Sequence, residues 1–277
     1  MEKLQAALAR AREQRDGSEG SRPLRPELTA RNKSRRAAQA EAIDAAWNAI
    51  PKFEPSPKRL QASRIFAVEA SHDAQYFDIL RTKLLLEMRK NSWTRIAITS
   101  ATPNCGKTTI ACNLIAGLGR QPEIRGIFVD MDLRRPAVSK LFGASPAASF
   151  EDVLNESVPF EEQAMRLHDN TIVAMTTSPV RDPAQLINRA HTVELLDDLQ
   201  ATYQPDLMLF DLPPVLVSDE TRAFLKLIDA VIIVAGAESS TVSQIDEVER
   251  EVAQYTNVAG VVLNKCQHME EGYGYSY

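Results

Sequence analysis

The residues best suited to chemistry lie between an apolar run and a stretch with helical spacing. Residues 99–109 are Thr-Ser-Ala-Thr-Pro-Asn-Cys-Gly-Lys-Thr-Thr, and apolar residues at helical spacing follow them. Backbone N–H groups at the start of a helix, together with its dipole, attract an anion such as phosphate. Lys107 is then expected to reach the β- and γ-phosphates of a nucleotide, and Thr108 to offer its hydroxyl to Mg²⁺. The spacing therefore predicts a phosphate-binding loop.

The loop departs from the motif G-x-x-x-x-G-K-[ST] at its first position, where Ala101 replaces glycine. Asn104 lies where a loop around phosphate needs a residue able to take positive φ, and asparagine tolerates this best among non-glycine residues. An ordinary strand-to-helix turn that carries Gly-Lys-Thr is the alternative interpretation. The residues expected to bind nucleotide here are Pro103, Asn104, Cys105, Gly106, Lys107, Thr108 and Thr109.

Carboxylates follow two further apolar runs. Asp130 and Asp132 follow the run at 126–129, and Asp211 follows the run at 207–210. Open parallel sheets bind ligands beside the carboxyl ends of their strands, so these side chains are expected to face the bound phosphates. Asp-x-Asp can also simply terminate a strand. Its place about 20 residues after the loop favours the nucleotide-site interpretation.

The arrangement of apolar runs predicts the elements that position these residues. Strands are predicted at residues 94–98, 126–129, 171–175, 207–211, 230–234 and 258–263, the last two as central strands. Helical spacing is found at residues 71–91, 110–118, 190–203 and 240–254. Asn264 ends the last predicted strand, where its amide could contact an adenine edge. This order predicts a P-loop NTPase, an α/β fold with a mostly parallel central sheet flanked by helices.

Composition limits the kind of protein. The chain has 277 residues, a net charge of −5 and three cysteines. Three scattered cysteines are too few for a disulfide framework or a zinc site, which favours a reducing, cytoplasmic setting. No run approaches the roughly 18 apolar residues of a membrane span. We therefore expect one sizeable α/β domain, an additional arm and no membrane-spanning segment.

Residues 1–64 differ from the rest and are interpreted as an N-terminal arm, helical in part and otherwise disordered. The basic patch at 31–36 could attract anionic lipid or nucleic acid. A solvated helix face is the favoured interpretation, and no nucleic-acid partner is expected. Prolines at 51, 55 and 57 end any helix in the arm. The predicted kinase or ATPase domain then spans 65–267, and a tail spans 268–277.

Two motifs carry a resemblance to a known family. Asp130-x-Asp132-x-Arg134 after an apolar strand, with Phe210-Asp211-x-Pro213-Pro214 downstream, resembles the bacterial tyrosine kinases (BY-kinases) of exopolysaccharide synthesis. In particular the chain is similar to the cytoplasmic autokinases of exosortase-associated loci. The resemblance runs from about Phe77 to Lys265. It implies that Lys107 and Thr108 belong to a Walker A motif, Asp130 and Asp132 to Walker A′, and Asp211 to Walker B.

The resemblance also implies an activity, the transfer of the ATP γ-phosphoryl group to tyrosine. The implied catalytic residues are Lys107, Asp130, Asp132 and Asp211, with Asp130 accepting or orienting the tyrosine hydroxyl proton. Thr108, Asp132 and Asp211 are the implied ligands of Mg²⁺. The family has a tyrosine-rich tail, and three of the six tyrosines of this chain lie in its last five residues. The implied autophosphorylation sites are Tyr273, Tyr275 and Tyr277.

The resemblance implies partners as well. A membrane-embedded polysaccharide chain-length regulator would act as activator and hold the protein at the inner face of the plasma membrane. Such kinases often carry Glu-x-x-Arg-x-x-Arg for ring formation, but residues 75–81 keep only Arg81, so the family type of homo-oligomer stays open. Two other function classes stay open too: an ATP-hydrolysing switch that binds a membrane partner, and a nucleotide-binding scaffold without catalysis.

Overall fold

The structure is a computed structural model that describes residues 26–266, with side chains from residue 34 onward. The chain divides into two compact units, residues 1–44 and residues 45–277. Of the first unit, the structure describes part of one helix. The second unit holds the sheet and all of the motifs identified above that the structure describes. The tail tyrosines Tyr273, Tyr275 and Tyr277 and residues 1–25 of the predicted arm lie outside the described residues.

A seven-stranded sheet forms the centre of the second unit, with strand order β3-β4-β2-β5-β1-β6-β7. All neighbouring strands are parallel except β3 and β4, which are antiparallel. Most strands are buried along their length, which agrees with their β-branched, apolar sequences. The strands are β1 (Arg95–Ser100), β2 (Gly126–Asp130), β3 (Met165–His168), β4 (Thr171–Ala174), β5 (Leu207–Asp211), β6 (Ala230–Gly236) and β7 (Asn257–Asn264).

The strand order brings three motifs to one place. Strand β5 lies between β1 and β2, with Asp211 paired in register with Asp130 on one side and Ile98 on the other. The phosphate-binding loop follows β1, so the loop and both acidic motifs meet at the carboxyl edge of three adjacent strands. This edge is where parallel α/β sheets bind ligands.

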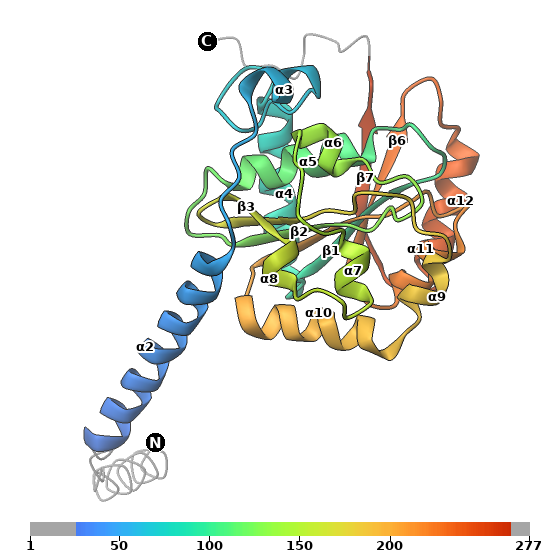
Figure 1. The fold of residues 1–277 in the computed structure, drawn as a ribbon. Helices are drawn as coiled ribbons and strands as arrows, with labels where there is room; N and C mark the ends of the chain where they lie inside the picture. Colours follow the sequence, from blue (N-terminus) through green and yellow to red (C-terminus); the bar gives the residue numbers. More distant parts are fainter. Residues whose placement is uncertain (1–25, 267–277) are drawn as a thin grey trace, which may run out of the picture. The chain divides into compact units, whose positions relative to one another are not determined.

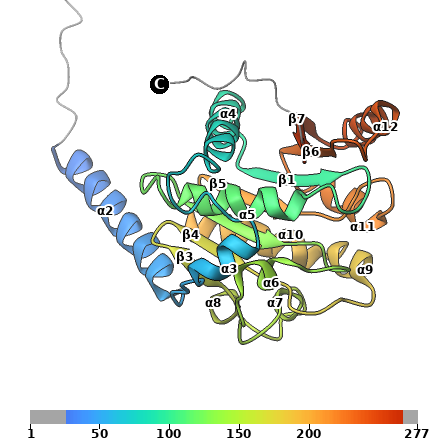
Figure 2. The same cartoon turned by 90° about the horizontal axis from the view of Figure 1, so that it is seen from above.

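Helices cover both faces of the sheet. Figure 1 shows α5 and α10 on opposite sides, and Figure 2 shows α5 lying over the strands when the fold is seen from above. Helix α5 packs against four strands and α4. The helices are α2 (Pro26–Ala49), α3 (Pro57–Ala62), α4 (Gln75–Asn91), α5 (Lys107–Leu118), α6 (Val138–Phe142), α7 (Phe150–Leu154), α8 (Phe160–Gln163), α9 (Pro183–Ile187), α10 (Ala190–Tyr203), α11 (Asp219–Leu225) and α12 (Val242–Val252).

The fold confirms the predicted P-loop NTPase architecture and corrects two strand predictions. Strand β7 forms one edge of the sheet and is only half-buried, although the sequence favoured a central strand. Its apolar run is as continuous as that of a central strand, so the pattern could not distinguish the two positions. Strand β3 was missed because its four residues, Met-Arg-Leu-His, are too short and too polar to give a strand pattern.

The second unit begins before the predicted arm ends. Trp47, Ile50 and Leu60 are buried, and backbone hydrogen bonds join Phe53 N to Arg166 O at 2.9 Å and Arg166 N to Pro51 O at 2.7 Å. The predicted boundary at residue 64 therefore falls inside this unit, because apolar side chains of the supposed arm complete its core. No helix within the described residues is long and apolar enough to cross a membrane.

Candidate nucleotide and phosphoryl-transfer site

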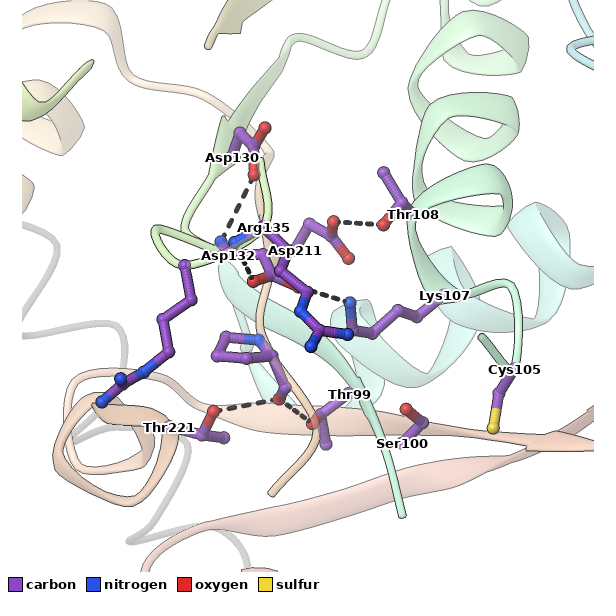
Figure 3. Close-up of polar contacts among 12 residues, drawn as sticks. Thr99, Ser100, Cys105, Lys107, Thr108, Asp130, Asp132, Arg135, Asp211 and Thr221 are labelled. Atoms are coloured by element: carbon purple, nitrogen blue, oxygen red, sulfur yellow. Dashed lines mark hydrogen bonds and ion pairs between the residues drawn. The ribbon is translucent and has the colours of Figure 1, made fainter. Parts of the chain in front are cut away.

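Lys107, the first residue of α5, is paired with an acidic residue from the loop after β2. Its Nζ donates to Asp132 Oδ2 at 2.7 Å, and both side chains are about nine-tenths buried. Figure 3 shows Lys107 reaching from the helix start toward Asp132. Burial would lower the pKa of Lys107, but the surrounding Asp211, Asp132 and Asp130 carboxylates raise it above its ordinary value. The ammonium therefore keeps its charge, as phosphate binding requires.

Thr108 faces the neighbouring carboxylate. Its Oγ1 donates to Asp211 Oδ2 at 2.6 Å, whereas the buried Oδ1 of Asp211 has no hydrogen-bond partner in the part of the chain that the structure describes. Burial raises the pKa of Asp211 to about 6 despite the nearby Lys107 ammonium. A hydroxyl and a carboxylate oxygen are ligands that Mg²⁺ prefers, and an unpartnered buried oxygen suits a cation or its water. The pair therefore fits a magnesium site, although no cluster of three or more His, Cys, Asp or Glu that could hold a metal occurs among the described residues.

Asp130 lies behind this pair and is fully buried. Its Oδ2 accepts from Val138 N at 3.2 Å and its Oδ1 from Asp132 N at 3.3 Å. Burial and the Asp211 carboxylate raise the pKa of Asp130 well above its usual range. In this arrangement its carboxylate ties the loop after β2 to the sheet.

The phosphate-binding loop has the backbone that its sequence predicts. Asn104 has φ 66° and Gly106 has φ 92°, both in the left-handed region. Asn264 Nδ2 donates to Cys105 O at 2.8 Å, and a Cβ at Gly106 would lie 2.2 Å from the same nitrogen. Lys265 Nζ donates to Asn104 O at 2.7 Å. Asn264 at the end of β7 and Lys265 after it therefore stabilise the loop by donating hydrogen bonds to its carbonyl groups. The side-chain amide of Asn264 binds the loop backbone.

A cavity of about 740 Å³ opens at this edge of the sheet. Of the predicted site residues, Pro103, Asn104, Gly106, Lys107, Thr108, Thr109 and Asp132 line it. Cys105 is buried, with its Sγ donating to Thr102 O at 3.2 Å, and Asp130, Asp211 and Asn264 do not line the cavity. Most of the predicted residues thus line the cavity, and the others contact the lining residues or lie next to them in the chain.

The cavity lining also contains residues that the sequence analysis did not assign to the site. Arg134 is paired with the buried Glu220, with Nε 2.5 Å from Oε1, although 86 residues separate them in the chain. Pro213 O accepts hydrogen bonds from Thr99 Oγ1 at 2.7 Å and Thr221 Oγ1 at 2.9 Å, which fixes the loop after β5. The remaining lining residues are Arg134, Arg135, Ala137, Leu141, Pro213, Pro214, Val217, Ser218 and Lys265. The pair Arg134-Arg135, two and three residues after Asp132, was the available sequence signal for these lining residues.

Comparisons with known proteins agree with this geometry. The putative tyrosine-protein kinase EpsB of Ralstonia nicotianae is 30% identical over 200 residues, which cover 71% of this chain and 26% of EpsB. The tyrosine-protein kinase YwqD of Bacillus subtilis is 24% identical over 221 residues, which cover 78% of this chain and 92% of YwqD. The chain belongs to the bacterial tyrosine kinase family. No family model matches it.

This bacterial tyrosine kinase homologue also shares the fold of a solved member of the family. The kinase domain of the Escherichia coli tyrosine kinase ETK superposes with a TM-score of 0.66 at 24% identity, over 75% of this chain and 82% of that domain. This likeness supports the fold alone. The chain spans about a quarter of the length of the first curated relatives it matches, such as EpsB at 26%.

Proposed function

We propose that this chain is an ATP-dependent protein-tyrosine autokinase that phosphorylates Tyr273, Tyr275 and Tyr277 of its own tail. The observation that carries the proposal is the convergence of Lys107, Thr108 and Asp132 on one cavity at the carboxyl edge of β1, β5 and β2. A P-loop provides binding and charge neutralisation, which phosphoryl transfer needs more than covalent help from the protein.

The residues at the cavity have different roles in the proposed reaction. The loop amides and Lys107 bind the phosphates of ATP. Thr108 and Asp211 would hold Mg²⁺, which supplies charge neutralisation on the phosphates when bound. A bond then forms between the phenolic oxygen and the γ-phosphorus as the bond to the bridging oxygen breaks, and ADP leaves with that electron pair.

We assign the phenolic proton to Asp132. It is the only carboxylate of the three acidic motif residues that lines the cavity, and binding of Lys107 to phosphate frees its Oδ2. Asp130, which the family resemblance favoured for this role, is fully buried and accepts two backbone hydrogen bonds.

The first test is incubation of the purified chain with ATP and Mg²⁺, followed by mass spectrometry of the C-terminal peptide. We expect phosphotyrosine on the tail in the wild type, none in Lys107→Met, and a larger loss in Asp132→Asn than in Asp130→Asn. An equal loss in the two aspartate variants would contradict the assignment to Asp132, and a larger loss in Asp130→Asn would assign the proton to Asp130. ATP turnover without phosphate on any tyrosine, even with a cytoplasmic segment of a candidate activator present, would replace the autokinase with an ATP-hydrolysing switch.

The biological setting is proposed from the family. Autophosphorylation of this chain would regulate exopolysaccharide synthesis or export, with a membrane-embedded polysaccharide chain-length regulator as activator. Each added phosphate brings roughly two negative charges, so tail phosphorylation would weaken self-association by repulsion. Binding to the activator would place the protein at the inner face of the plasma membrane.

A further inference from the structure

Four cations line the cavity, and three of them have partners. Lys107 is paired with Asp132, Arg134 with Glu220, and Lys265 donates to the carbonyl of Asn104. The side chain of Arg135 has no hydrogen-bond or ion-pair partner among the described residues. An exposed guanidinium on a cavity wall is available to a ligand.

The backbone of Arg135 is fixed by hydrogen bonds, although its side chain is exposed. Its backbone N–H donates to Asp132, at 3.1 Å from both the Oδ1 and the carbonyl oxygen. Pro136 follows directly, is buried, and restricts the backbone of the residue before it. The backbone of Arg135 is thus held beside Asp132, to which we assign the phenolic proton, and Arg135 lines the same cavity.

The tail of the chain carries the complementary charge. Glu270 and Glu271 precede Tyr273 by three and two residues, whereas Tyr275 and Tyr277 are four and six residues beyond Glu271. In an extended peptide, residues two or three positions apart are separated by roughly 7 to 10 Å. This separation allows the guanidinium to contact a glutamate while the tyrosine hydroxyl lies near Asp132.

We propose that Arg135 is a specificity-determining residue that selects acceptor tyrosines preceded by acidic residues, with Glu270 and Glu271 directing Tyr273 into the cavity. The proposal rests on the autokinase function. It names an acidic, tyrosine-containing peptide as the preferred acceptor class and makes Tyr273 the first tail site to be phosphorylated. The contact is solvent-exposed, so its contribution is that of an exposed ion pair, about a three- to fivefold change in rate.

The test measures initial phosphorylation rates of the three tail tyrosines in the full chain by mass spectrometry. In the wild type, Tyr273 is expected to be phosphorylated about three to five times faster than Tyr275 and Tyr277. Glu270→Gln with Glu271→Gln removes this preference, and so does Arg135→Gln. Combining the three substitutions causes no further change in the relative rates, because each set of substitutions already removes the same contact between Arg135 and the glutamates.

An exchange of charges separates recognition from a general loss of activity. Arg135→Glu combined with Glu270→Lys and Glu271→Lys is expected to restore the preference for Tyr273. Arg89→Gln, which removes an exposed positive charge from the last turn of α4, is the matched control and leaves the preference unchanged. Raising the ionic strength from about 0.05 M to about 0.5 M weakens the preference, because salt screens exposed charges.

The outcomes distinguish this proposal from the one on which it rests. If Arg135→Gln slows all three tyrosines equally and the glutamate substitutions keep their effect in that background, Arg135 acts on ATP and the acceptor preference is wrong. Equal rates on the three tyrosines in the wild type overturn the preference and leave the autokinase intact. No phosphate on any tyrosine overturns both.

Discussion

Three buried carboxylates surround one ammonium group at the edge of the sheet. Asp130, Asp132 and Asp211 are each at most 5% exposed, and Lys107 is the charged partner they share. A cluster with this excess of negative charge is costly in a low-dielectric interior. The raised pKa values of Asp130 and Asp211 follow from that cost. The site therefore favours the arrival of a divalent cation, which neutralises the excess charge.

Removal of the shared ammonium should affect both activity and stability. Lys107→Met leaves Asp132 buried without its partner, a loss that costs about 3 to 5 kcal/mol in buried pairs. Loss of a preorganised charge on the transferring group lowers the rate by about 10²-fold or more. Urea unfolding and phosphorylation assays measure the two effects. Lys265→Met, which removes another cavity cation without breaking an ion pair, should keep its folding stability within about 1 kcal/mol.

The pH dependence of stability reports on Asp211. Its pKa is about 6 in the folded chain and about 3.9 in an unfolded one, so the folded state binds this proton more tightly. The contribution of Asp211 to stability is therefore most favourable below pH 4 and falls as the pH rises toward 6. Relative to Asp211→Asn, the wild type should lose about 2 kcal/mol between pH 4 and pH 7.

Urea unfolding at several pH values, without nucleotide or Mg²⁺, measures this difference. Asp198→Asn removes an exposed carboxylate of α10 and serves as the control, with no comparable pH-dependent gap. A wild-type difference from Asp211→Asn that does not change with pH would contradict the assignment of a raised pKa to this residue.

At the scale of elements, the phosphate-binding loop depends on a strand far along the chain. The loop joins β1 to α5. Its carbonyl groups at Asn104 and Cys105 accept hydrogen bonds from Lys265 and Asn264, which lie at the carboxyl end of β7. Strand β7 is the half-buried edge of the sheet, so its carboxyl end is free to lie against the loop. The edge position explains why the end of this strand serves as a clamp.

Gly106 should be the least replaceable position of the loop. Gly106→Ala places a Cβ 2.2 Å from Asn264 Nδ2 and keeps an alanine at φ 92°. We expect a loss of about 1 to 3 kcal/mol in unfolding free energy and weaker ATP binding, because the clamp must move. Denaturant unfolding and nucleotide titration test this.

Asn104→Gly is the matched control, since φ 66° suits glycine without strain. It should keep its stability within about 1 kcal/mol of the wild type. Equal stability of Gly106→Ala and Asn104→Gly would show that the contact between Gly106 and Asn264 does not constrain the loop.

At the scale of the whole molecule, the residues just before α3 belong to the folded unit. Trp47 is 2% exposed, and its Nε1 donates to Tyr203 O at 2.7 Å. Its ring also packs edge-on against Tyr203, and the Arg125 guanidinium lies over it. A side chain from the predicted arm thus joins the end of α10 to the strand β2 region.

Two truncations should separate the two units. A chain that begins at residue 45 should have a free energy of unfolding within about 0.5 kcal/mol of that of the full chain, since it keeps the second unit whole. A chain that begins at residue 65 should lose at least about 3 kcal/mol, because it lacks Trp47 and the other buried residues before it. Trp47→Ala in the full chain gives the size of that single contribution. Equal stability of the two truncated chains would place the boundary at residue 64 after all.

The sequence alone determined the local parts of this protein. A β-branched run, a loop with Gly-Lys-Thr and a helical pattern specify strand, phosphate-binding loop and helix, because each depends on neighbouring residues. The carboxylates Asp130, Asp132 and Asp211 were found for the same reason, since each directly follows an apolar run. The fold class followed from the order of these pieces.

Only the tertiary structure decided how the pieces meet. The place of β5 between β1 and β2 sets Asp211 beside Thr108, and the edge position of β7 commits Asn264 to the loop. The pairing of Arg134 with Glu220 leaves Arg135 as the cavity cation whose side chain has no partner among residues 26–266. These contacts join residues tens of positions apart. They depend on strand order and burial, which local patterns of residue type do not encode.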